Sequence, residues 1–145
     1  MTGRAVAALA AAIGLASGTC AFAQPMSKAE YLVAQKNIVS DFKGARIGCE
    51  PMQGNVNALC LVDVAGREAI ALAELEAAYL PNPKTRNDVH IAKAQAGYEM
   101  AREKCAHKPA DAKGACLKEA EAGHVAARAD PDAQARTAAI NAGKR

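Results

Sequence analysis

Two stripes of mainly apolar and small residues recur along the chain at alternating intervals of four and three positions. The first stripe comprises Tyr31, Gln35, Ile38, Phe42, Ala45 and Cys49, and the second comprises Asn87, Ile91, Ala94, Tyr98, Ala101 and Cys105. Residues at this spacing lie on one side of an α-helix, so each stripe predicts a helix that turns this side toward a partner helix. No segment alternates apolar and polar residues as a half-buried strand does. The pattern therefore predicts an all-α protein.

Helix-breaking residues divide the chain further. Prolines and a glycine fall in three predicted turns, at Pro51 with Gly54, at Pro81 with Pro83, and at Pro109. We expect helices from Ser27 to about residue 48, over 56–79, from Thr85 or Asn87 to Cys105, and over 112–129. Ser27 and Glu30 match a capping box, and Asn55 and Asp111 are the residue types expected at the N-caps of the second and fourth helices. Asp130 and Pro131 favour a short fifth helix.

The cysteines reveal an internal repeat. Cys49 and Cys60 reappear 56 positions later as Cys105 and Cys116, and Phe42 reappears as Tyr98. This predicts two αα-hairpins, over 24–80 and 84–129, each closed by a disulfide and together forming an antiparallel four-helix arrangement, with 130–145 as a short C-terminal helix or tail. Each disulfide closes a short loop and is expected to stabilise the fold by roughly 3 kcal/mol. We predict the pairs Cys49–Cys60 and Cys105–Cys116, and the alternative is the nested pattern Cys49–Cys116 with Cys60–Cys105.

The N-terminus has the features of a secretory signal peptide. Arg4 precedes an apolar stretch, and small residues occupy the cleavage positions Ala21 and Ala23, so the sequence predicts removal of 1–23. An uncleaved anchor and a lipidated Cys20 are the alternatives. Cleavage leaves four cysteines, an even number that is typical of disulfides in an exported protein. We therefore expect a soluble periplasmic protein, with no transmembrane segment after cleavage.

Composition explains why such a protein needs disulfides. Trp is absent, aromatic residues make up 3% of the chain, and Ala is frequent, so the helices approach closely but bury little apolar area. The formal net charge of +3 is not concentrated in a Lys/Arg cluster, and nucleic-acid binding is not expected.

Candidate chemistry is sparse. There is no phosphate-binding loop and no nucleophile elbow, so we expect no catalytic residues, no cofactor and no enzymatic activity. His90, His107 and His124 are interpreted as ordinary surface or loop residues. The alternative is a metal site formed by Cys105, His107 and Cys116, with His124 or solvent as the fourth ligand. A disulfide at Cys105–Cys116 is the favoured interpretation, because Pro51 replaces His107 in the first repeat.

Almost the whole predicted mature chain resembles a family of uncharacterised exported proteins of β-proteobacteria. The segments "MSKAEY", "GNVNALC", "ALAELEAAYLPNPKTRNDV" and "YEMAREKC" carry the resemblance, together with Gly54, Asn55 and the four cysteines. The segment "KPADAKG" departs from it, because it lacks the Gly-Asn of the first turn. Such proteins are sometimes labelled TolA-like because of their composition, and the resemblance implies two Cys–loop–Cys helical units but no activity.

The sequence thus favours a non-enzymatic periplasmic protein that acts through helix-mediated contacts in the envelope or stress response, with an envelope protein or a second copy as partner. The alternative is a metal-binding or metal-buffering protein, suggested by the His and Cys residues of the second hairpin and by Met52.

Overall fold

The fold is a layer of four antiparallel helices. A computed structural model describes residues 25–129, in which α1 spans Lys28–Cys49, α2 spans Gly54–Tyr79, α3 spans Pro83–Ala106 and α4 spans Ala110–Arg128. No strand occurs in this part of the chain. The predicted all-α class and the two hairpins closed by Cys49–Cys60 and Cys105–Cys116 are confirmed. The predicted signal peptide and fifth helix lie outside the described residues.

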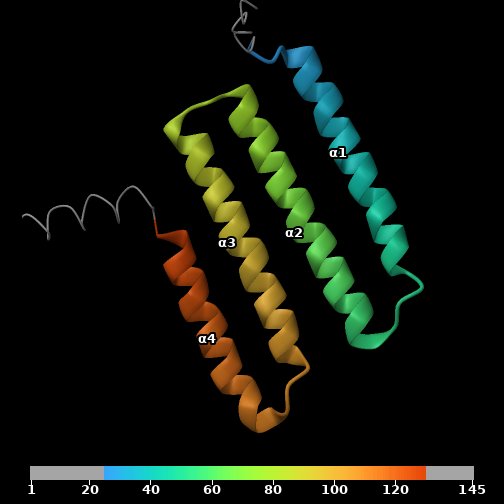
Figure 1. The fold of residues 1–145 in the computed structure, drawn as a ribbon, viewed down its shortest axis with the longest axis vertical. Helices are drawn as coiled ribbons and strands as arrows, with labels where there is room; N and C mark the ends of the chain where they lie inside the picture. The colour runs from blue at the N-terminus through green and yellow to red at the C-terminus, as the bar shows by residue number, and fades with distance from the viewer. Residues whose placement is uncertain (1–24, 130–145) are drawn as a thin grey trace, which may run out of the picture.

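Each helix packs only on its neighbours in sequence. Contacts join α1 to α2, α2 to α3 and α3 to α4, and α1 does not return to contact α4. The helices therefore form an open layer with α1 and α4 at its two edges (Figure 1). None of the helices in residues 25–129 is long and apolar enough to cross a membrane.

The open arrangement leaves a small core. The buried residues are Cys49, Val64, Leu75, Thr85, Ala94 and Cys105, and α4 contributes none of them. A single layer exposes both of its faces to solvent, so most apolar side chains are only half covered. The disulfide sulfurs supply part of the little interior that exists, since Cys49 and Cys105 are the most completely buried side chains.

The start of α1 is the predicted capping box. The Ser27 N–H donates to Oε2 of Glu30 at 2.7 Å, and the Glu30 N–H donates to Oγ of Ser27 at 3.3 Å. These hydrogen bonds lower the pKa of Glu30, chiefly because the Ser27 backbone N–H stabilises the carboxylate.

The start of α3 differs from the prediction. The helix begins at Pro83, earlier than the predicted Thr85 or Asn87, and Asn82 is its N-cap. Proline is tolerated at the first helical position because its missing N–H would have no partner there. The Asn82 side chain accepts the Thr85 N–H at 3.0 Å, while the Thr85 hydroxyl donates to the Leu80 carbonyl at 2.6 Å. This network closes the turn between the two hairpins.

Two predicted N-caps are wrong. Gln53 and Pro109 occupy the N-cap positions of α2 and α4, and neither forms a side-chain cap hydrogen bond. Asn55 and Asp111 lie inside the first turns instead. At α2 the helix begins at Gly54 with a φ of 57°, a left-handed conformation that glycine adopts without strain. This early turn moves the start of the helix one residue ahead of Asn55.

Candidate interaction surface

The inner side of α1 packs on α2 mainly through aromatic and charged groups. The Tyr31 and Tyr79 rings stack with centroids 4.6 Å apart, and Arg67 lies 5.9 Å from the centroid of the Phe42 ring. Arg46 forms an ion pair with Glu68 across the same interface. The stripe predicted from the sequence is thus turned toward α2, with the exception of Ala45, whose methyl group is exposed.

The carboxylate of Glu76, near this interface, changes the pKa of Tyr31. The Glu76 carboxylate, as an acceptor for the Tyr31 hydroxyl, is the main reason that the pKa of Tyr31 is raised. The hydroxyl therefore remains protonated, as a hydrogen-bond donor, in the range where a free tyrosine would begin to ionise.

The outer side of α1 carries a second apolar stripe that no other helix in residues 25–129 covers. Leu32, Val33, Val39 and Ile47 are 44%, 58%, 45% and 56% exposed. Leu32 and Val39 are seven positions apart and Val33 and Ile47 fourteen, so each pair returns to the same side of the helix. Lys36 and Lys43 lie among them. We call these six residues the α1 outer edge.

This stripe was not among the predicted features, although the sequence contains a signal for it. The four apolar residues recur at helical spacing just as the inner stripe does. A periodic pattern cannot say which of two apolar sides is covered, because that depends on whether another helix reaches it. The packing of the described helices, in which α4 does not reach α1, shows that none of them covers the stripe.

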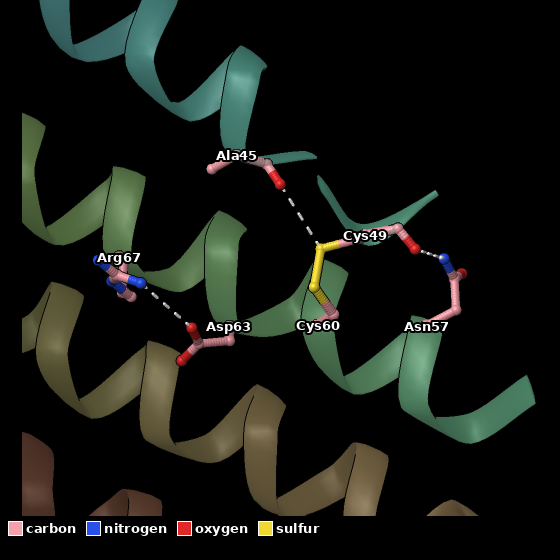
Figure 2. Close-up of a disulfide and its surroundings, with 6 residues drawn as sticks. All are labelled: Ala45, Cys49, Asn57, Cys60, Asp63 and Arg67. Atoms are coloured by element: carbon pink, nitrogen blue, oxygen red, sulfur yellow. Dashed lines mark hydrogen bonds and ion pairs between the residues drawn. A yellow bond between two sulfur atoms is a disulfide. The ribbon is translucent and has the colours of Figure 1, made fainter. Parts of the chain in front are cut away.

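The first disulfide fixes the C-terminal end of α1 on α2. Cys49 and Cys60 have Cα atoms 5.7 Å apart, and the Asn57 side-chain amide donates to the Cys49 carbonyl at 2.7 Å (Figure 2). The Cys49 sulfur lies 3.7 Å from the Ala45 carbonyl oxygen, which is a contact and not a hydrogen bond because a disulfide sulfur bears no hydrogen. Asn57 thus gives a second donor to a carbonyl at the helix end that also accepts the Met52 N–H at 3.0 Å.

The second disulfide involves two of the candidate metal ligands. Cys105 and Cys116 are bonded to one another, so neither sulfur is a thiolate in this state. His107 lies 3.1 Å from a Glu103 carboxylate oxygen, one turn back on α3. Within residues 25–129, no three His, Cys, Asp or Glu side chains are grouped as metal ligands.

A groove of about 590 Å³ runs between α3 and α4. Small residues form much of its wall, and the Tyr98 and His124 rings stack in it with centroids 4.4 Å apart. Nε2 of His124 is buried and has no hydrogen-bond partner among the described residues. His124 occupies the repeat position of Glu68, so a ring stack replaces the Arg46–Glu68 ion pair of the first hairpin. His90 is exposed on α3.

A second groove, of about 470 Å³, follows the seam between α2 and α3. Its walls are lined by Ala65, Gly66 and Ala69 on α2 and by Gln95, Ala96 and Glu99 on α3, among others. Lys93 and Glu74 pair across the same seam at 2.7 Å. These contacts define how one hairpin of the repeat packs on the next.

Comparison with protein-family models, with curated proteins and with solved structures found no match to this chain.

Proposed function

We propose that this is a non-enzymatic exported protein of the cell envelope, which acts by binding other proteins through the exposed sides of its helices, in envelope maintenance or stress. The observation that carries the proposal is the α1 outer edge, where four large apolar side chains are 44–58% exposed. Contiguous exposed apolar side chains with charged neighbours are typical of protein–protein interaction sites.

The chemistry of the α1 outer edge suits a helical partner. Its apolar residues recur at helical spacing, and an amphipathic helix or a helical layer presents a matching row of side chains. Burying such residues contributes about 25 cal/mol for each Å² of apolar surface removed from water. The neighbouring lysines favour a partner with acidic residues beside its apolar row.

The two disulfides support export. Disulfides form and persist in oxidising compartments such as the bacterial periplasm, and are rare in the cytosol. The intact mass of protein recovered from the periplasm tests this part of the proposal. A chain beginning at Gln24 is expected, whereas a retained N-terminus or a lipid on Cys20 would contradict it.

Photocrosslinking in intact cells tests the binding function. A photoreactive amino acid at Val33, which is 58% exposed, is expected to give discrete adducts with a partner protein. The same group at Asp63, an exposed polar position on α2, is the control and is expected to give none. Absence of adducts from Val33, together with no suppression of client aggregation by the purified oxidised protein, would overturn the proposal.

A further inference from the structure

We propose that copies of this protein associate edge to edge, with the outer side of α1 in one copy packing on the outer side of α4 in the next, in the register that α2 and α3 have within one chain. The inference rests on the proposed function and names a second copy as the partner. The inference follows from the internal repeat. A shift of 56 positions relates the side of α3 that packs on α2 to the outer side of α1, and the side of α2 that packs on α3 to the outer side of α4.

Residues that line the groove between α2 and α3 have repeat equivalents on the outer sides of α1 and α4. On α3 the α2–α3 groove is lined by Gln95, which stays exposed at its rim, and a shift of 56 positions converts Gln95 into Val39 on α1. The side of α2 that faces α3 includes Ala69, and the same shift converts it into Val125 on α4. Gln95 and Ala69 line one groove, so the repeated register places Val39 opposite Val125.

Both valines are exposed in the single chain. Val39 is 45% exposed and Val125 is 67% exposed. Val125 is the large apolar residue that α4 exposes most, on the side turned away from the groove with α3. Together with Lys118, Glu121 and Ala122 it forms what we call the α4 outer edge. Their equivalents Gln95 and Ala69 remain exposed at the rim of the α2–α3 groove, so edge-to-edge packing in this register would shield the two valines from solvent only in part.

Charge supports the same register. Glu99 on α3 and Ala65 on α2 line the α2–α3 groove, and their repeat equivalents are Lys43 on α1 and Glu121 on α4. The register therefore brings a lysine opposite a glutamate, and both side chains are exposed in the single chain. This one pair of opposite charges is attractive in the proposed register.

Two positions make the contact looser than the α2–α3 seam. Ala122 stands where α2 has Gly66, so the edges cannot approach as closely as α2 approaches Ala96. Lys36 comes opposite Arg128, and like charges repel, although both are exposed and screened by solvent. The association is accordingly expected to depend on protein concentration.

The contact is head to tail, so each copy uses one edge and leaves the other free for a further copy. This gives a sharp test by sedimentation velocity on the exported protein with both disulfides formed. The sedimentation coefficient of the wild-type protein is expected to increase as its concentration rises, because larger assemblies form. Val39→Asp, which damages only the α1 outer edge, and Val125→Asp, which damages only the α4 outer edge, are each expected to remain monomeric.

Mixing the Val39→Asp and Val125→Asp variants is the decisive experiment. The intact α4 outer edge of the Val39→Asp chain can pack on the intact α1 outer edge of the Val125→Asp chain, so an equimolar mixture is expected to form dimers that grow no further. Val56→Asp is the matched control. Val56 is 56% exposed but lies at the start of α2, away from both edges, and this variant is expected to associate like wild type.

Charge reversal gives a second test on variants that leave the apolar residues in place. Lys43→Glu and Glu121→Lys are each expected to weaken association, and their combination in one chain to restore it. Circular dichroism confirms that every variant remains folded. Wild-type protein that stays monomeric at every concentration would overturn the inference. Loss of association in Val39→Asp but not in Val125→Asp would also overturn it, because that result indicates a contact between two copies of α1. A monomer that still forms adducts with a different protein from Val33 would leave the proposed function standing.

Discussion

Gly66 on α2 lies in close contact with Ala96 on α3, at the seam between the two hairpins. A Cβ atom added at Gly66 would lie 2.9 Å from the Cβ atom of Ala96. Carbon atoms in favourable contact are about 3.5–4.0 Å apart, so only glycine permits this separation. The seam between the hairpins therefore depends on the absence of one methyl group.

Gly66→Ala is expected to destabilise the protein by about 1 kcal/mol. Overpacking costs about 1–3 kcal/mol, and the higher helix propensity of alanine returns about 1 kcal/mol of it. Urea unfolding followed by circular dichroism measures the change. Gly97→Ala is the control, because no atom lies within 4 Å of an added Cβ there, and it is expected to stabilise the protein. Equal effects at the two positions would show that α2 and α3 are farther apart than described.

Thr85→Val tests the turn that joins the hairpins. Thr85 is 5% exposed, and its hydroxyl donates to the Leu80 carbonyl and accepts the Asn82 N–H at 3.2 Å. Valine keeps the shape but removes both hydrogen bonds. The Leu80 carbonyl still accepts the Asn82 side-chain amide at 3.0 Å, so the loss is chiefly that of the acceptor for the Asn82 N–H and is expected to be about 1 kcal/mol. Thr85→Ser retains the hydroxyl and is expected to lose less stability in the same unfolding measurement. A smaller loss for Thr85→Val than for Thr85→Ser would show that packing of the methyl group matters more.

The two disulfides are expected to differ in what they hold together. On the chain-entropy model each contributes about 3 kcal/mol. Replacing Cys105 and Cys116 by alanine leaves α4, which has no buried residue of its own, held by the stacking of His124 on Tyr98, and is expected to loosen it. Replacing Cys49 and Cys60 leaves α1 held by the stacking of Tyr31 on Tyr79 and also by the Arg46–Glu68 ion pair.

Hydrogen exchange resolved by peptide measures this difference. In the chain lacking Cys105 and Cys116, faster exchange is expected throughout α4 while α1 and α2 stay protected. In the chain lacking Cys49 and Cys60, α1 is expected to keep part of its protection. Equal loss of protection in all helices for both double variants would contradict the distinction and indicate that the layer unfolds as one unit.

The capping box at α1 predicts a dependence on pH. The hydrogen bonds from Ser27 lower the pKa of Glu30 in the folded protein. A group whose pKa is lowered by folding adds stability above its ordinary pKa, and this contribution is lost as the pH falls through the lowered value. Glu30→Gln is expected to melt at a lower temperature than wild type at neutral pH, and the difference to shrink under acidic conditions. A difference in melting temperature that does not change with pH would show that the carboxylate charge is not involved.

The sequence alone determined the parts of this protein that depend on local spacing. The four helices follow from apolar periodicity, and the pairing of Cys49 with Cys60 and of Cys105 with Cys116 follows from two short, repeated loops. The helix starts were harder to predict because they depend on backbone geometry. Asn55 is a good N-cap type, but the left-handed Gly54 begins the helix before it.

Only the tertiary structure decided which apolar side chains are covered. The spacing of Tyr31 and Phe42 shows that they share one side of α1, and Leu32 and Val39 share another by the same criterion. The distance between α1 and α4 cannot be predicted from the spacing of apolar residues, so the sequence does not distinguish a closed four-helix bundle from an open layer. In the open layer each helix packs only on its neighbours in sequence. The outer sides of α1 and α4 are left exposed because no further helix among the described residues reaches them.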